Sequence, residues 1–294
     1  MITLPQSFVI RNKVIRNLST KWIEGGNSNS ERILFFIHGF PDTAHTFNHQ
    51  FEYFKDDFLI LAPFLRGLGL SKNKSAPIPK NRFSINSHLL DFFEIINHYD
   101  PDKKKKITIV CHDIGGLYAW RLARDLGSSR ASIVAINAPS LEMMAKRLLS
   151  PRQLKKSWYI AIFQIPFFSE LLWTKYDEAL INFAYRDSSE LPPRIYRSSE
   201  AMMLYREAFK TILNQKSWQS LKKKSIDQAV PSLYLAASDD PFLVVPSKKE
   251  IVEIGENCTI RIVKGGHWLH RSEKDKINLY IKNFINHEGS SEKT

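Results

Sequence analysis

Short apolar segments separated by turn signals recur along the first half of the chain. Four of them have the length of a strand, at residues 32–37, 58–62, 106–111 and 131–136. Between the second and third, apolar residues recur every three or four positions over residues 85–98, which predicts a helix. Strands that alternate with helices predict a parallel sheet covered by helices on both faces.

This pattern stops after Pro139 and returns at Pro231. The intervening residues contain no convincing strand and predict helices over 153–163, 169–185 and 198–213. Strands are predicted again at 231–236 and 259–263, followed by a closing helix at 274–285. A helical insertion between two parallel strands would lie over their carboxyl ends, where such sheets bind ligands. We therefore predict a core domain of residues 1–138 and 231–294, with a helical cap at 139–230.

The chain is basic, with 42 lysines and arginines against 30 acidic residues and a net charge of +12. Such a charge suits nucleic acid or an acidic membrane surface. The lysine runs at 103–106 and 222–224 lack interleaved aromatic residues, which favours solvated loops over nucleic-acid binding. Cys111 and Cys258 are too few for a disulfide framework or a four-thiolate metal site, so a cytoplasmic protein is predicted.

No signal peptide is visible near the N-terminus. The most apolar run, at 158–168, is well short of the roughly twenty residues that a membrane-spanning helix needs. We expect no transmembrane segment. Peripheral membrane contact stays open, as does the choice between a monomer and a homodimer.

The residues around Asp113 predict a sharp turn from a strand into a helix. Small residues two positions before and after a nucleophile, here Cys111 and Gly115, allow such a turn to hold the side chain exposed. The alternative is an aspartate that caps the following helix. The Gly115-Gly116 pair favours the nucleophile turn.

A second motif, His38-Gly-Phe-Pro-Asp42, ends the strand at 32–37. A glycine turn at this place can direct backbone N–H groups toward the neighbouring turn, so the N–H groups of Phe40 and Ile114 are predicted to bind an oxyanion. His38 itself fits a buried residue that orients the turn better than it fits a base.

Two further motifs follow strands, with Asp240 in Ser-Asp-Asp-Pro and His267 in Gly-Gly-His-Trp. Asp113, Asp240 and His267 have the chain order of the nucleophile, acid and histidine in α/β-hydrolases. Each motif alone is typical of an ordinary turn. Four motifs that each follow a strand together indicate one active site.

These motifs, HGFPD, CHDIGG, SDDPFL and GGHW, resemble those of α/β-hydrolases of the epoxide hydrolase branch, and the resemblance covers about residues 10–285. It implies an α/β-hydrolase fold with a mostly parallel central sheet and a helical cap inserted after the sixth strand. Tyr159 and Tyr205 lie in segments similar to those that carry the two epoxide-activating tyrosines. His38 and Trp268 are grouped with Phe40 and Ile114 at the oxyanion and substrate site.

The chain departs from that family at three places. Ile114 stands where tryptophan commonly follows the nucleophile, Phe64 where aspartate is usual, and Cys111 where glycine is usual. These departures bear on the shape of the pocket and the choice of substrate. They leave the backbone N–H of Ile114 available to an oxyanion.

A carboxylate nucleophile suits alkyl transfer, because its attack on a saturated carbon leaves an ester that water can cleave. Two phenols with an ordinary pKa of about 10 would protonate the alkoxide of an opening epoxide, and His267 would activate water. We predict an epoxide hydrolase acting on a small lipophilic substrate and water. A dehalogenase with the same triad and a non-catalytic binding protein are the alternatives.

Neither a nucleotide cofactor nor a metal is predicted. The chain contains no phosphate-binding glycine motif. His45 and His49 are one helical turn apart but lack the glutamate of a zinc protease.

Overall fold

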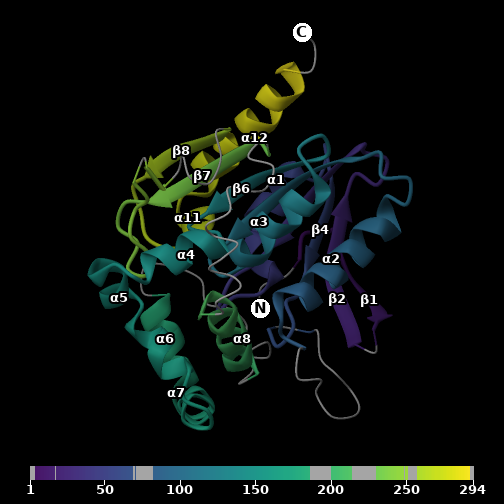
Figure 1. The fold of residues 1–294 in the computed structure, drawn as a ribbon. Helices are drawn as coiled ribbons and strands as arrows, with labels where there is room; N and C mark the ends of the chain where they lie inside the picture. Colours follow the sequence, from purple (N-terminus) through teal and green to yellow (C-terminus); the bar gives the residue numbers. More distant parts are fainter. Residues whose placement is uncertain are drawn as a thin grey trace.

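The computed structural model describes residues 4–16, 18–68, 70, 82–185, 200–213, 230–247, 249–250 and 257–291. Eight strands form one sheet in the order β1-β2-β4-β3-β5-β6-β7-β8 (Figure 1). Their bounds are β1 Val9–Ile15, β2 Leu18–Gly26, β3 Arg32–Ile37, β4 Leu59–Pro63, β5 Lys106–His112, β6 Ala131–Ile136, β7 Ser232–Ala237 and β8 Cys258–Val263. The strands from β3 to β8 are parallel and confirm the six predicted strands.

The two N-terminal strands were not predicted from the sequence. β2 pairs antiparallel with both β1 and β4, so β1 forms one edge of the sheet. Six of the seven residues of β1 are exposed. A strand with so little buried surface shows a weak alternation of apolar and polar residues. It is therefore recognised as a strand only by its pairing with β2.

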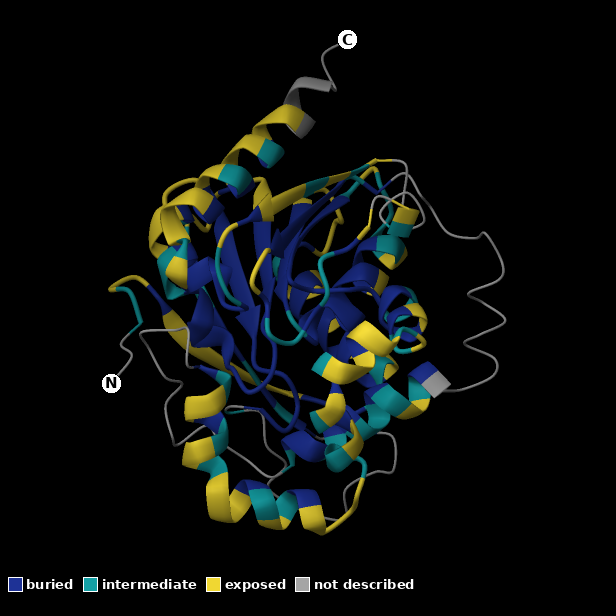
Figure 2. Cartoon of the chain, turned by 90° about the vertical axis from the view of Figure 1, so that its left-hand side faces the viewer, coloured by how far each residue is buried: buried dark blue, intermediate teal, exposed yellow. Residues whose placement is uncertain are grey.

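Helices cover both faces of the sheet. Successive residues of β3 illustrate this, because Phe35 packs with one core cluster and Phe36 with the other. The first face carries α2 Ile85–Tyr99 and α3 Gly115–Leu126, and the second carries the 3-10 helix η1 Ala44–Phe47, α1 Asn48–Phe54, α11 Leu269–Ser272 and α12 Lys274–Ser291. Figure 2 shows that the strands are mostly buried, whereas exposed positions gather on the outer helices.

Five described helices lie between β6 and β7, and we call this segment the helical insertion. They are α4 Leu141–Arg147, α5 Pro151–Lys156, α6 Trp158–Phe163, α7 Phe168–Ala184 and α8 Ala201–Leu213. The helix predicted at 153–163 is two helices that separate at Ser157, and α7 is kinked at Tyr176. The predicted start of α8 at residue 198 lies outside the described residues.

The insertion follows the sixth strand, as predicted. The boundaries of the core and cap domains remain predictions. In the described part of the chain, no helix combines the length and the apolar character needed to cross a membrane.

Candidate active site

Asp113 lies on the turn between β5 and α3, where its backbone has a φ of 53°. This left-handed conformation is strained for a residue with a side chain, and such strain is common at functional sites. The surrounding turn needs glycine. A Cβ on Gly115 would lie 2.5 Å from the carbonyl oxygen of Ile37, and a Cβ on Gly39 would lie 2.5 Å from the Cβ of Asp113. This close packing holds the Asp113 carboxylate at the carboxyl edge of the sheet.

His267 connects the two carboxylates of the predicted triad. Its Nε2 is 3.4 Å from Oδ2 of Asp113, and its Nδ1 is 2.7 Å from Oδ2 of Asp240. The other oxygen of Asp240 accepts hydrogen bonds from the backbone N–H groups of Phe242 and Leu243. The side chain of Asp113 is 13% exposed, whereas those of Asp240 and His267 are 2% exposed. The predicted nucleophile is therefore the most exposed of the three, and both Asp113 and His267 line a cavity.

The charges of these three groups depend on one another. Burial alone would lower the pKa of His267, but Asp240 and Asp113 together raise it to about 10. Burial would raise the pKa of each carboxyl group, yet His267 holds both below their ordinary values. At neutral pH the resting site therefore contains an imidazolium between two carboxylates.

The residues predicted to bind an oxyanion lie beside the nucleophile. The backbone N–H of Phe40 donates to Oδ1 of Asp113 over 2.9 Å. Ile114 lines the same cavity as Asp113. Trp268 lines the space on the other side of Asp113, and its indole N–H donates to Oδ2 of Asp42 over 3.1 Å.

His38 has a different environment. Its Nδ1 donates to the carbonyl of Gly39 over 2.9 Å, and its Nε2 accepts the backbone N–H of Leu65 over 3.0 Å. Burial lowers its pKa to about 4, so the ring is neutral at physiological pH. The side chain connects two backbone turns, and the residues that line the two cavities do not include it.

Two cavities meet at Asp113, Tyr159 and Tyr205. The inner cavity has an empty volume of about 490 Å³ and a largely aliphatic wall. The outer cavity has an empty volume of about 800 Å³ and a largely aromatic wall. The inner wall includes Ile114, Leu117, Met144, Ile160, Ile212 and Leu243, and the outer wall includes Phe40, Trp158, Phe163, Trp173, Phe242 and Trp268.

The structure brings both predicted tyrosines to this junction. Their ring centroids are 6.3 Å apart, and that of Tyr205 is 4.9 Å from the ring of Phe40. The neighbouring hydroxyl groups shift each other's pKa in opposite directions, lowering that of Tyr159 and raising that of Tyr205. Burial and the charge of Asp113 raise the pKa of both phenols overall. The expectation of ordinary phenol pKa values is therefore wrong for the resting site.

Two polar residues of α5 hold the helical insertion to the loop after β7, and sequence reasoning missed both. Gln153 is fully buried. Its amide N–H donates to the carbonyl of Phe242, and its amide oxygen accepts the N–H of Val244. Lys156 donates to the carbonyls of Asp240 and Leu243. Glutamine and lysine on a short helix are usually exposed, so only the packed structure identifies these contacts.

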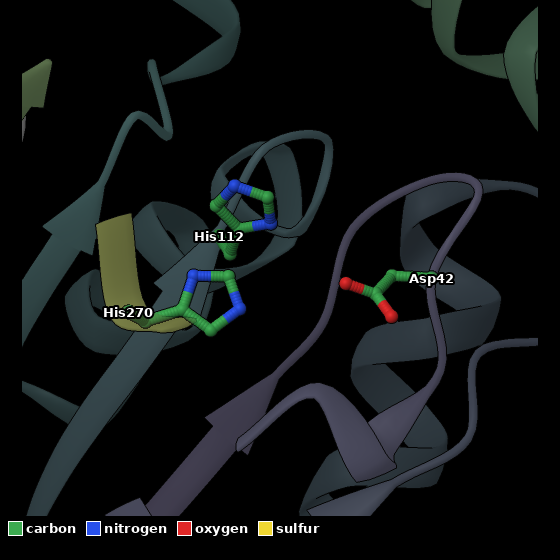
Figure 3. A group of neighbouring side chains, drawn as sticks. All are labelled: Asp42, His112 and His270. Atoms are coloured by element: carbon green, nitrogen blue, oxygen red, sulfur yellow. The ribbon is translucent and has the colours of Figure 1, made fainter. Parts of the chain in front are cut away.

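Asp42, His112 and His270 form a buried cluster behind the nucleophile turn (Figure 3). One potential ligand atom from each lies within 4.8 Å of the others, so these are the described residues best placed to hold a metal. The hydrogen bonds that these side chains make also suit a structural role, in which the cluster supports the loops around it. Nε2 of His112 is 3.1 Å from the carbonyl of His267, and Nε2 of His270 is 2.6 Å from Oγ1 of Thr46.

The three departures from the family pattern have different surroundings. Ile114 is almost buried and faces the inner cavity, so it affects the space beside the nucleophile. Phe64 is buried against the ring of His45, at 5.6 Å between centroids. Cys111 is fully buried in the core, and burial raises the pKa of its thiol. Of the three, only Ile114 lines either cavity.

Residues 32–273 match the family model described as the alpha/beta hydrolase fold. The chain belongs to the α/β-hydrolase fold family. The predicted likeness to epoxide hydrolases is confirmed, and with it the prediction of a hydrolase.

The proteins to which this chain is similar include epoxide hydrolases and a protein named only as an AB hydrolase. Human epoxide hydrolase 4 is 25% identical, and the match covers 87% of this chain and 73% of that protein. An AB hydrolase superfamily protein of Bacillus subtilis, YfhM, is 26% identical over 87% of this chain and 91% of its own. A mutant epoxide hydrolase of Bacillus megaterium, crystallised with its diol product, has a TM-score of 0.74 at 20% identity. The likeness to that structure covers 94% of this chain and all of the other and shows a common fold.

Proposed function

We propose that the protein is an epoxide hydrolase that converts lipophilic epoxides to vicinal diols through an ester on Asp113. The observation that carries this proposal is the junction of the two cavities. There a carboxylate held by His267 and a backbone N–H lies in the same space as two phenols. The helical insertion, which supplies both phenols, would serve as the cap.

In the first step, a carboxylate oxygen of Asp113 would attack an epoxide carbon and the ring C–O bond would break. The departing alkoxide would take a proton from the phenol pair of Tyr159 and Tyr205. In the resting site, the negative charge of Asp113 helps to raise the pKa of His267. Formation of the ester removes this charge and therefore lowers the pKa of His267. His267 would then release its proton and replace the one lost by the phenols.

In the second step, neutral His267 would take a proton from water as the water oxygen attacks the ester carbonyl. The N–H groups of Phe40 and Ile114 would stabilise the negative oxygen of the tetrahedral intermediate. As the intermediate collapses, its C–O bond to the substrate would break and the departing alkoxide would take the proton of the new carboxyl group. This releases the diol and restores the Asp113 carboxylate with imidazolium beside it. One oxygen of the restored carboxylate comes from water.

The residue that follows the nucleophile and the two tyrosines favour an epoxide over a haloalkane. A departing halide needs N–H donors at the nucleophile, whereas an alkoxide stays attached to the substrate and needs a proton. Ile114 offers no side-chain donor, and the tyrosines offer hydroxyl groups. A non-catalytic binding protein would have no use for an imidazolium paired with two carboxylates.

A screen of chemically varied epoxides and haloalkanes tests this proposal. We expect diol formation from lipophilic epoxides, measured by chromatography, with little halide released from haloalkanes. Halide release without diol from any epoxide would assign dehalogenation instead. An absence of both products across the screen would favour the non-catalytic alternative.

A further inference from the structure

Large apolar side chains lie exposed along the outer side of α5, α6 and the start of α7. We define the apolar rim as Leu154, Trp158, Ile165, Phe167, Phe168 and Leu171. Their exposed fractions are 51%, 55%, 50%, 88%, 47% and 62%. Single exposed apolar residues are ordinary, but six within eighteen positions mark an interaction surface.

The most exposed part of the apolar rim is held in place. Arg206 of α8 donates through its guanidinium to the carbonyls of Phe163 and Ile165 and to the hydroxyl of Ser169. It also forms an ion pair with Glu170. These contacts fix both ends of the turn between α6 and α7, so its exposed side chains are presented by an ordered backbone.

Phe167 stands at the tip of this turn with a φ of 63°. Positive φ is strained for a bulky residue. Its carbonyl accepts the N–H of Leu171, but the ring itself is 88% exposed and packs little within the chain. Strain that is retained to expose an aromatic ring indicates a contact outside the protein.

We propose that the apolar rim docks the protein on the surface of a lipid bilayer that contains anionic headgroups. Exposed Arg152 and Lys155 flank Leu154, and Lys175 lies one turn beyond Leu171. Such a mixture of apolar and basic side chains matches a bilayer interface, and the net charge of +12 favours anionic lipid. The charge that would oppose anionic lipid is that of Glu178, an exposed acidic residue further along α7.

The rim also adjoins the outer cavity. Trp158 belongs to both. The cavity wall also includes Ile162, one helical turn after Trp158, and Leu172, next to Leu171 in the sequence. A lipophilic molecule dissolved in the bilayer would therefore meet an apolar route to Asp113. A symmetric dimer through the same surface would bring its basic residues close to one another, which opposes self-association.

Vesicle flotation of the full chain, without substrate, tests this inference independently of the proposed function. The probes are phosphatidylcholine vesicles with and without about one-third phosphatidylserine. We expect binding that is stronger with phosphatidylserine and weaker at high salt. Replacing Phe167 and Leu171 together with serine should lower binding by about tenfold or more.

Val14 and Ile262 provide the matched control, since both are exposed and lie on strands at the two edges of the sheet. Their double serine variant should bind vesicles as the parent does. Arg152→Glu with Lys155→Glu should abolish the preference for phosphatidylserine. The inference fails if the parent does not bind, or if the rim variant binds equally well. It also fails if sedimentation shows a dimer that the rim variant dissociates while vesicle binding is absent.

Discussion

The two sides of the candidate site are held in different ways. On the sheet side, Asp113, Asp240 and His267 follow strands, and backbone N–H groups bind both carboxylates. On the insertion side, Tyr159 and Tyr205 belong to separate helices. Side chains hold this part of the insertion, through Gln153 and Lys156 of α5 and through Arg206 of α8, which donates to Phe163 of α6.

The charged groups on the sheet side are thus held by the backbone, whereas the phenols on the insertion side are positioned by other side chains. Backbone donors at strand ends cannot be removed by a side-chain substitution, so the charged groups keep their geometry when neighbours change. The phenols depend on replaceable contacts. Variation in the insertion should therefore change rate and substrate choice, whereas a change at the turn should stop the reaction.

The largest effect is expected for Asp113→Asn. An amide cannot form the ester, so turnover should fall by about 10⁴-fold or more while the circular dichroism spectrum stays unchanged. Activity must be measured promptly, since slow deamidation restores aspartate. Asp239→Asn, at an exposed neighbour of Asp240, is the control. A stably amidated Asp113→Asn variant with parental activity would remove Asp113 as nucleophile.

Next in size is the effect of Tyr159→Phe combined with Tyr205→Phe. Loss of the proton donors should lower the rate of epoxide opening by about 10²–10⁴-fold, measured as single-turnover diol formation. Either single variant should lose less, because the remaining phenol still lies at the junction. Tyr176→Phe, on the exposed side of α7, is the control. An unchanged rate of diol formation in the double variant would remove both tyrosines as the proton donors.

The sequence predicted the parts of the fold that local patterns encode. The strands from β3 to β8 are apolar runs that end in turn residues, and the glycines around Asp113 are required by the close packing there. Such signals lie within a few neighbouring positions. They were sufficient to predict that Asp113, Asp240 and His267 lie together, and the catalytic roles of the three stay predictions.

Other features depend on contacts between distant segments. β1 is largely exposed, so its residues carry little apolar pattern. Gln153 is buried only because the loop after β7 offers a carbonyl and an N–H to its amide. The raised pKa values of the tyrosines arise from burial and from the charge of Asp113. None of these follows from the residue type alone.

The third prediction concerns the pH dependence of stability. The folded pKa of His267 is about 10, above its ordinary value of 6.5. Its contribution is therefore complete below about pH 6.5 and is lost as pH rises through 10. Chemical denaturation should show that the stability difference between the parent and His267→Gln shrinks by a few kcal/mol across this range. A constant difference would mean that His267 is neutral in the resting site.

A smaller effect is expected for Gln153→Ala. It leaves the carbonyl of Phe242 and the N–H of Val244 without their partner, which should cost about 1–3 kcal/mol of unfolding free energy. The rate should fall by about tenfold through displacement of the insertion. Gln164→Ala is the control, since the amide of Gln164 donates to Ile160 one turn earlier. Equal losses in both variants would contradict a special role for Gln153.

The covalent ester on Asp113 is tested most directly in the His267→Gln variant. The carboxylate can still attack the epoxide in this variant, but the ester has lost the base that activates water. Intact-protein mass spectrometry after substrate addition should show a gain of one substrate mass, and fragmentation should place it on Asp113. Normal turnover with an unshifted protein mass would contradict both the ester and the role of His267.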